Sequence, residues 1–457
     1  MPIPLMRNLL TLSCLITLVT ALAGLFFIND LAWMHTILII SLVVTALTAA
    51  RRGARGTAIS AGLTALIGLT WALSQWYPLY IGLSLLAVAV AAVGLSSALR
   101  RSRPSTRGRR TLHRVVVVVV AVPLTAVTVV LGVTAITPVP LITFLQSTAF
   151  PASNRGQVAD PGAEQEVGNG DVRISDIRYG STYPNSFLDV YLADGDRTGT
   201  APTMVYVHGG GYTWGDKASN DPTTNTTSSA VDVYSPFLDA GYNVVSLNYA
   251  LAPEYNYPVP ILQMSEAMAF LADQGAQYGL STDQLVLIGG SAGGQLVGQF
   301  AAIQTNPDYS ASTGIAPVVP AGNLRAVLFN SALLDLEQFS NTGTAYIDYI
   351  FLQCGRSYFS DGFLGNAEVK EANVIDAISA DFPPSYISDG NYATFDAQAH
   401  RLDNRMEELG ISHEFTYFPR SEAKLFHGFE TGTTPQAAEN LQRELRFLST
   451  HVPVQGS

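Results

Sequence analysis

The sequence has little of what a disulfide-stabilised domain or a metal site needs. Of its 457 residues only two are cysteines, Cys14 and Cys354. Cys14 lies in an apolar run and Cys354 in the polar remainder, so the polar part cannot form an internal disulfide. No group of Cys and His has the spacing of metal ligands, and we therefore expect no structural metal.

The first 150 residues lack lysine and have almost no acid. They contain eleven Arg and a single acidic residue, Asp30, whereas the remainder has 14 basic and 35 acidic residues. The formal charges are +10 and −21, which sum to −11. A basic, apolar front and an acidic, polar back indicate a membrane segment joined to a soluble domain. Because an acidic domain repels phosphates, we expect no nucleic-acid partner.

Five apolar stretches in this front segment contain no Asp, Glu, Lys or Arg. Each has about 20 residues, which as a helix would cross a hydrocarbon core of about 30 Å. Helices without a polar face are not typical of soluble cores. The sequence therefore predicts an all-α transmembrane bundle of about five helices within residues 1–137, with spans at Leu9 to Ile28, Leu31 to Ala50, Thr57 to Trp76, Leu79 to Leu99 and Val115 to Ile136.

The first stretch has a second interpretation. Arg7, the apolar run and Ala21-Leu22-Ala23 resemble a secretory signal with a small-residue cleavage site. Hydrophobicity continues to Ile28, which favours an uncleaved helix, but cleavage stays open.

Arginines indicate the orientation of the predicted bundle. They precede the first span and fill the loops after the second and fourth, so all of these loops fall on one side. If basic loops are cytoplasmic, five crossings place everything after Ile136 outside the cytoplasm. We expect a multi-pass protein of the cell membrane with an extracytoplasmic soluble domain.

Residues 138–170 are rich in Pro, Gly and Ser and read as a linker. In the domain predicted at 171–457, the first two β-rich runs look like a hairpin and the later ones alternate with helical patterns. This order favours an α/β domain with a mostly parallel eight-stranded sheet and helices on both faces. The expected strands are Ile174 to Tyr179, Phe187 to Leu192, Met204 to His208, Val244 to Tyr249, Leu285 to Ile288, Ala326 to Phe329, Ser385 to Ser388 and Glu414 to Phe418.

One glycine-rich turn carries a candidate nucleophile. Gly289-Gly290-Ser291-Ala292-Gly293 follows the apolar run Leu285 to Ile288 and precedes a helical pattern. G-x-S-x-G in a strand–turn–helix setting exposes a serine at the carboxyl edge of a sheet. We therefore predict Ser291 as the nucleophile.

A second glycine run closes an earlier strand, in His208-Gly209-Gly210-Gly211-Tyr212. Consecutive glycines let backbone N–H groups approach a substrate oxygen. The predicted oxyanion donors are Gly209 and Gly210, with Ala292 following the nucleophile. Tyr212 and Trp214 flank this loop as candidate substrate-binding residues, although aromatics near a sheet edge more often serve simple packing.

The serine needs a general base and an acid. His427 follows the last predicted strand and precedes the C-terminal helix, where the chain order Ser…acid…His puts the base. The acid should follow the strand Ser385 to Ser388. Asp389 comes immediately after it and Asp396 seven residues later; we favour Asp389 but keep both.

Three motifs in order carry a resemblance to a family. His208 to Gly211, Asn248-Tyr249-Ala250-Leu251-Ala252-Pro253-Glu254 and Gly289 to Gly294 resemble the hormone-sensitive-lipase-like branch of the α/β-hydrolases. They are also similar to bacterial feruloyl-esterase-like and acetyl-esterase-like carboxylesterases. The resemblance implies an α/β-hydrolase fold and hydrolysis of carboxylic esters through an acyl-serine intermediate, without a cofactor.

The sequence departs from the family's motifs at two places. Ala250 stands where the family often has Arg, and Asn391 to Thr394 replace the usual acid motif. The implied substrate is a small-molecule or lipid ester, with the membrane as a further partner. Two alternatives stay open: a serine peptidase of the same fold, and a non-catalytic membrane scaffold with a degenerate hydrolase domain.

Overall fold

The computed structural model describes residues 3–26, 32–52, 54–74, 77–101, 107–149, 161–218, 230–359 and 365–454. The chain divides into two compact units, which we call the helical unit (Met1–Leu141) and the sheet unit (Ile142–Ser457). Parts of the predicted spans (27–28, 31 and 75–76) and of the predicted linker (150–160) lie outside the described residues.

The helical unit consists of helices, most of which are long and apolar. They are α1 (Ile3–Phe26), α2 (Ala32–Arg51), α3 (Arg55–Ser74), α4 (Tyr77–Arg101) and a continuous segment of α5 (Arg107–Val115), η1 (Val116–Ala121) and α6 (Val122–Ile136). In the described part of the chain one helical segment, Thr111–Thr134, is long and apolar enough to cross a membrane, and Asn8–Leu22, Thr36–Arg51 and Gly82–Ser97 are shorter apolar helices. The described residues therefore support one candidate span rather than the five predicted.

The sheet unit contains a nine-stranded sheet in the order β1-β2-β3-β5-β4-β6-β7-β8-β9. Strands β1 to β3 and β5 pair antiparallel, and the rest pair parallel. The strands are β1 (Glu164–Gly168), β2 (Asp171–Arg178), β3 (Phe187–Leu192), β4 (Thr203–Val207), β5 (Asn243–Leu247), β6 (Leu285–Gly290), β7 (Leu324–Asn330), β8 (Ser385–Asp389) and β9 (His413–Tyr417).

The prediction of eight strands was one too few. The missed strand, β1, is a short edge strand of Glu, Gln, Val and Gly whose residues are mostly exposed. It has no buried face, so it leaves no alternation of apolar and polar residues for sequence reasoning to find. The segment expected as a linker thus contains β1, and also helix α7 (Val139–Thr148).

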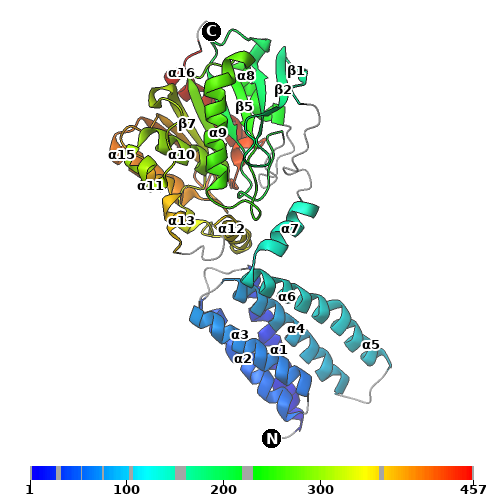
Figure 1. Ribbon diagram of the computed structural model, residues 1–457. Helices are drawn as coiled ribbons and strands as arrows, with labels where there is room; N and C mark the ends of the chain where they lie inside the picture. The colour runs from blue at the N-terminus through cyan, green and yellow to red at the C-terminus, as the bar shows by residue number, and fades with distance from the viewer. Residues whose placement is uncertain are drawn as a thin grey trace. The chain divides into compact units, whose positions relative to one another are not determined.

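Helices cover both faces of the sheet (Figure 1). Apolar residues of α9 (Val259–Gln274), α10 (Ala292–Thr305) and α15 (Asp396–Leu409) form a core with one face. Residues of α8 (Ala230–Asp239) and α16 (Pro435–His451) form a second core with the other. The remaining helices are α11 (Pro307–Thr313), α12 (Ala345–Tyr358), α13 (Ala367–Glu371) and α14 (Val374–Ala377).

The parallel strands bring the predicted site residues to one edge of the sheet. Gly209 follows β4, Ser291 follows β6, Asp389 ends β8, and His427 lies between β9 and α16. Because carboxyl ends of neighbouring parallel strands meet at the same edge, these four positions converge although the sequence separates them widely.

Candidate active site

Ser291 sits on the sharp turn between β6 and α10. Its backbone has φ 53° and ψ −121°, a conformation that non-glycine residues rarely adopt. The turn also requires glycine at position 293, because a Cβ there would lie 2.0 Å from the carbonyl oxygen of Val207. Helix α10 therefore begins directly against the end of β4, which brings the nucleophile to the loop that follows β4.

That loop is the glycine run predicted to supply oxyanion donors. Gly210 has φ 98°, and a Cβ on it would lie 2.1 Å from the carbonyl oxygen of Trp214. Its own carbonyl accepts hydrogen bonds from the N–H groups of Thr213 and Trp214, at 3.0 and 3.1 Å. The loop thus closes into a tight turn that only glycine can form at this position.

Asn248 and Tyr249, which belong to the second of the three motifs, contact the loop that contains the first motif, His208 to Gly211. The Tyr249 hydroxyl donates to the carbonyls of His208 and Gly209, at 3.0 and 3.2 Å, and the Tyr249 ring stacks on His208. The Asn248 side chain accepts from the backbone N–H of Lys217 at 2.6 Å. Both residues follow β5 and hold the glycine loop in place, so this motif acts on the site through backbone positioning.

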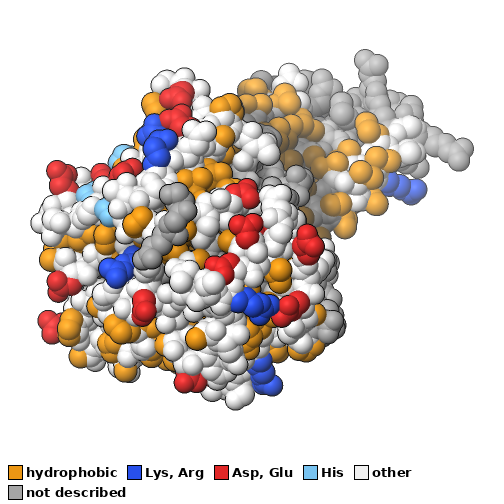
Figure 2. All heavy atoms as spheres, turned by 90° about the horizontal axis from the view of Figure 1, so that it is seen from above, with side chains coloured by type: hydrophobic (Ala, Val, Ile, Leu, Met, Phe, Trp, Pro, Cys, Tyr) orange, Lys and Arg blue, Asp and Glu red, His pale blue; other side chains and the backbone are white. Residues whose placement is uncertain are grey.

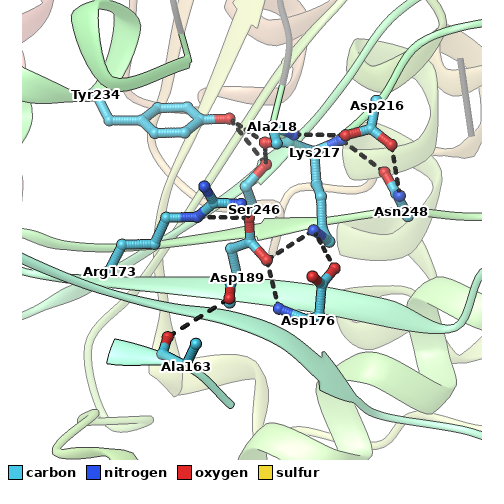
Figure 3. Close-up of polar contacts among 11 residues, drawn as sticks. Ala163, Arg173, Asp176, Asp189, Asp216, Lys217, Ala218, Tyr234, Ser246 and Asn248 are labelled. Atoms are coloured by element: carbon cyan, nitrogen blue, oxygen red, sulfur yellow. Dashed lines mark hydrogen bonds and ion pairs between the residues drawn. The ribbon is translucent and has the colours of Figure 1, made fainter. Parts of the chain in front are cut away.

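The far end of the loop is fixed by buried ion pairs (Figure 3). Lys217 Nζ lies 2.7 Å from Asp189 Oδ1 and 2.8 Å from Asp176 Oδ1, and Arg173 pairs with the other Asp189 oxygen at 2.6 Å. The carboxylates belong to β2 and β3 and together raise the pKa of Lys217, although burial opposes that rise. Removing one partner of such a cluster would leave an uncompensated buried charge, which typically costs about 3–5 kcal/mol.

His427 lies in a buried position at the same edge. Phe351 and Phe395 contact its ring in T-shaped arrangements, with ring centroids 5.5 and 5.2 Å away. Burial lowers the pKa of His427 to about 4, so the ring is neutral at neutral pH and can act as a base. Nδ1 lies 3.1 Å from Thr394 Oγ1, while Nε2 has no hydrogen-bond partner among the residues that the structure describes.

The two candidate acids occupy different environments. Asp389 is fully buried, and its Oδ1 accepts from the Gly390 N–H at 2.7 Å and from the Thr394 hydroxyl. Burial, and then the charge of Glu430, raise the pKa of Asp389 well above its usual range. Asp396 is the first residue of α15, and its Oδ1 accepts from the N–H of Ala397 at 2.9 Å. Asp389, not Asp396, is thus linked to His427, through Thr394.

Ser291 and His427 line one cavity of about 180 Å³. Its polar lining includes Glu430 and Glu444, and burial raises the pKa of each to about 7. The apolar wall comes from β4, α8, β6 and α16, through Tyr206, Val233, Pro236, Phe237, Ile288 and Leu441.

Of the three predicted oxyanion donors, Gly209 lines this cavity; Gly210 and Ala292 are not among its lining residues. Tyr212 and Trp214 do not line it either and are fully buried. The Tyr212 ring stacks on Tyr358 at 3.7 Å, and its hydroxyl donates to Gln295 at 2.8 Å. These contacts give both aromatics a packing role beside the glycine loop.

Sequence reasoning missed Thr394, Lys217 and Glu430. A lone Thr or Glu carries no motif, and its partners are distant in sequence: Ser331 and Ser388 donate to the Glu430 carboxylate at 2.9–3.0 Å. A lysine ten residues after a buried strand offers a weak signal at most, since surface lysines look the same.

Comparison with known proteins finds relatives that are named esterases. A sequence model of the BD-FAE family matches residues 188–398, from β3 into α15, a range that contains Ser291 and Asp389. Esterase LipI of Mycobacterium tuberculosis is 27% identical over 254 residues, which cover 54% of this chain and 72% of LipI. Esterase LipQ of the same organism is 27% identical over 222 residues, 48% of each chain, so the match spans about half of LipQ.

A solved structure shows the same fold. Esterase B of Lactobacillus rhamnosis superposes with a TM-score of 0.54 at 21% identity, covering 68% of this chain and 94% of that chain. At this identity the likeness concerns the fold alone. The sheet unit therefore has the α/β-hydrolase fold, and the sequence matches support the hydrolase family.

Proposed function

We propose that this chain cleaves carboxylic esters through an acyl-serine intermediate on Ser291, in a domain that N-terminal helices hold at a membrane. Its enzyme class is that of the carboxylic ester hydrolases, which the relatives named esterase support. The observation that carries the mechanism is the shared cavity: Ser291, on its strained turn, and His427, whose Nε2 has no hydrogen-bond partner among the described residues, both line it.

The chemistry follows from these positions. Ser291 Oγ attacks the ester carbonyl carbon while His427 Nε2 takes its proton, and N–H groups of Gly209, Gly210 and Ala292 stabilise the oxyanion. The imidazolium then protonates the departing alkoxide, which leaves an acyl-serine. Water, deprotonated by His427, then attacks the acyl carbon; the bond to Ser291 Oγ breaks, the imidazolium returns its proton to that oxygen, and the acid is released. In an unliganded site the serine–histidine hydrogen bond is often long and tightens when substrate binds.

The helical unit has apolar side chains on its outside and hydroxyl side chains in its interior, which supports a membrane anchor. Large apolar side chains face outward, such as Val118 at 64% and Leu66 at 59% exposure. Hydroxyl side chains face inward and pair between α1 and α2: Thr17 donates to Ser41 at 2.9 Å and Thr45 to Ser13 at 3.0 Å. Outward apolar residues with inter-helical hydroxyl contacts are typical of helices packed in lipid. Figure 2 shows, by contrast, acidic side chains scattered over the visible face of the sheet unit.

A panel of substrates tests the proposed function against the peptidase alternative. We expect the purified full-length protein to hydrolyse p-nitrophenyl esters with a marked dependence on acyl length, because the cavity of about 180 Å³ holds a limited chain. Aminoacyl p-nitroanilides of matched size should react far more slowly. Preference for the anilides would assign the site to the peptidases, and inertness toward both together with no labelling by a fluorophosphonate would favour the scaffold alternative.

A reporter fusion tests the proposed topology. A reporter that is active only outside the cytoplasm should be active when fused after Ser457, because the Arg-rich loops would retain the other side of the bundle in the cytoplasm. The matched control is a fusion after Arg101, at the end of α4, which should be inactive. A stably expressed but inactive C-terminal fusion would contradict an extracytoplasmic catalytic domain.

A further inference from the structure

A threonine hydroxyl stands between the buried acid and the base. Thr394 Oγ1 lies 3.1 Å from His427 Nδ1 and donates a short hydrogen bond to Asp389 Oδ1. Thr394 and Asp389 are both buried. Among the residues that the structure describes, no hydrogen bond joins Asp389 directly to His427, so the polar link from base to carboxylate passes through this hydroxyl.

The direction of the two hydrogen bonds follows from the donors available. Asp389 Oδ1 accepts from the Gly390 N–H as well as from Thr394, and a hydroxyl has only one hydrogen, so the Thr394 hydrogen points to Asp389. The lone pairs of Thr394 Oγ1 then accept from an N–H on His427 Nδ1. This arrangement keeps the ring hydrogen on Nδ1 and leaves a free lone pair on Nε2, the nitrogen that must take the proton of Ser291.

We propose that Thr394 is a positioning residue that relays Asp389 to His427, so that the working unit is Ser291–His427–Thr394–Asp389. The proposal rests on the proposed function. When Ser291 Oγ bonds to the ester carbon, its proton moves to Nε2. The hydrogens on Nδ1 and on the Thr394 hydroxyl stay on their own atoms, and their hydrogen bonds connect the new imidazolium to the Asp389 carboxylate. No proton has to cross the threonine.

The surrounding chain holds the hydroxyl at this place. Asn391 donates to the carbonyls of Phe418 and Ala423, at 2.9 and 2.8 Å, and accepts from the Leu425 N–H at 3.1 Å. The segment after β8 is therefore tied to the loop that carries His427. The ring of Phe395, next to Thr394, makes a T-shaped contact with His427. The loop that contains Thr394 and the loop that contains His427 are thus held together by hydrogen bonds.

The electrostatics of His427 agree with an indirect carboxylate. A carboxylate in direct contact with an imidazole raises the pKa of that imidazole. Burial lowers the pKa of His427 to about 4, so the geometry of the two hydrogen bonds through Thr394 carries the link to Asp389.

Substituting Thr394 tests the relay in the full-length protein. Thr394→Val removes the hydroxyl at nearly constant size. Because loss of the acid's hold on a triad histidine can cost about 10⁴-fold in turnover, we expect kcat to fall at least about 100-fold with KM within about threefold. Thr394→Ser should recover most of the loss. The control is Thr305→Val, which removes a buried hydroxyl bonded to Ala301 at the end of α10 and should leave kcat within about threefold.

A double variant separates a relay from a structural effect. If Thr394 and Asp389 act as one unit, Thr394→Val combined with Asp389→Asn should be no slower than the slower single variant, within about threefold. Should Thr394→Val fail to fold, Thr394→Cys replaces it with the same expectation, because a thiol of similar size is a weak hydrogen-bond donor.

Two outcomes would overturn the relay: Thr394→Val with normal kcat beside an inactive Asp389→Asn, or effects of the two substitutions that multiply fully. Hydrolysis that needs Ser291 yet tolerates Thr394→Val contradicts the relay alone. Hydrolysis that survives Ser291→Ala contradicts the proposed function itself.

Discussion

Replacing Ser291 by alanine should lower ester turnover by about 10⁴- to 10⁶-fold, because it removes the hydroxyl on which the proposed acyl intermediate forms. His427→Ala should cause nearly the same loss, since nucleophile and base act as a unit and their effects do not add. Labelling by a fluorophosphonate probe should disappear in Ser291→Ala. The fold should persist in both variants, which a thermal melt and near-UV circular dichroism would check.

Two matched controls make this result specific. Ser310→Ala removes a buried serine hydroxyl that donates to Ile315 at 2.8 Å in α11, and His413→Ala removes a histidine paired with Asp403 at the start of β9. Neither lines the cavity, so both should keep turnover within about threefold. Substantial turnover in Ser291→Ala or His427→Ala, at an intact fold, would mean that the nucleophile or the base is misassigned.

Replacing Asp389 by asparagine should cost most of the turnover, on the order of 10⁴-fold if it serves as the triad acid. Asparagine keeps the size of the side chain but loses the charge that stabilises the imidazolium, while thermal stability should change little. Asp396→Asn is the matched control, because Asp396 ends the segment that leads from β8 to α15. Its carboxylate accepts from the N–H of Ala397 at the start of α15. Losing a helix-end contact of this kind costs about 1 kcal/mol of stability, and turnover should stay near normal.

The comparison of kcat with melting temperature decides between the two acids. Lost turnover in Asp396→Asn with a normal Asp389→Asn would transfer the role to Asp396. Near-normal rates in both variants would describe an enzyme that works as a Ser–His dyad.

The strands and motifs were accessible to sequence reasoning because their causes are local. Each of the eight expected strands corresponds to an observed one. Five of them, β4 to β8, are short, largely buried runs bounded by turn residues, a pattern that sequence alone reveals. The Ser291 turn is also a local device: glycines on either side permit a backbone that other residues would block. Strand β1 escaped because an exposed edge strand has no hydrophobic signature.

The site's polar links were not accessible because they join distant segments. His427 meets Thr394 across 33 residues, Glu430 meets Ser331 across 99, and Tyr212 turns into the core to meet Gln295 across 83. Sequence spacing contains no information on which hydroxyl or carboxylate lies opposite which after the strands align. For the same reason the sequence left both packing and substrate binding open for Tyr212 and Trp214, because an aromatic beside a glycine loop can point to either side of it.

By itself the sequence determined the composition of two unlike segments, the order of strands and helices in the second, and the serine, glycine-loop and histidine positions that converge at one sheet edge. These follow from hydrophobic periodicity and from backbone conformations that only glycine adopts, both of which act over a few residues. Only the tertiary structure decided that Asp389 rather than Asp396 is linked to His427, that Thr394 lies between them, and that Lys217 anchors the glycine loop. Those contacts depend on the register of β8 against its neighbours and on buried charge pairing, and both are settled when the sheet assembles.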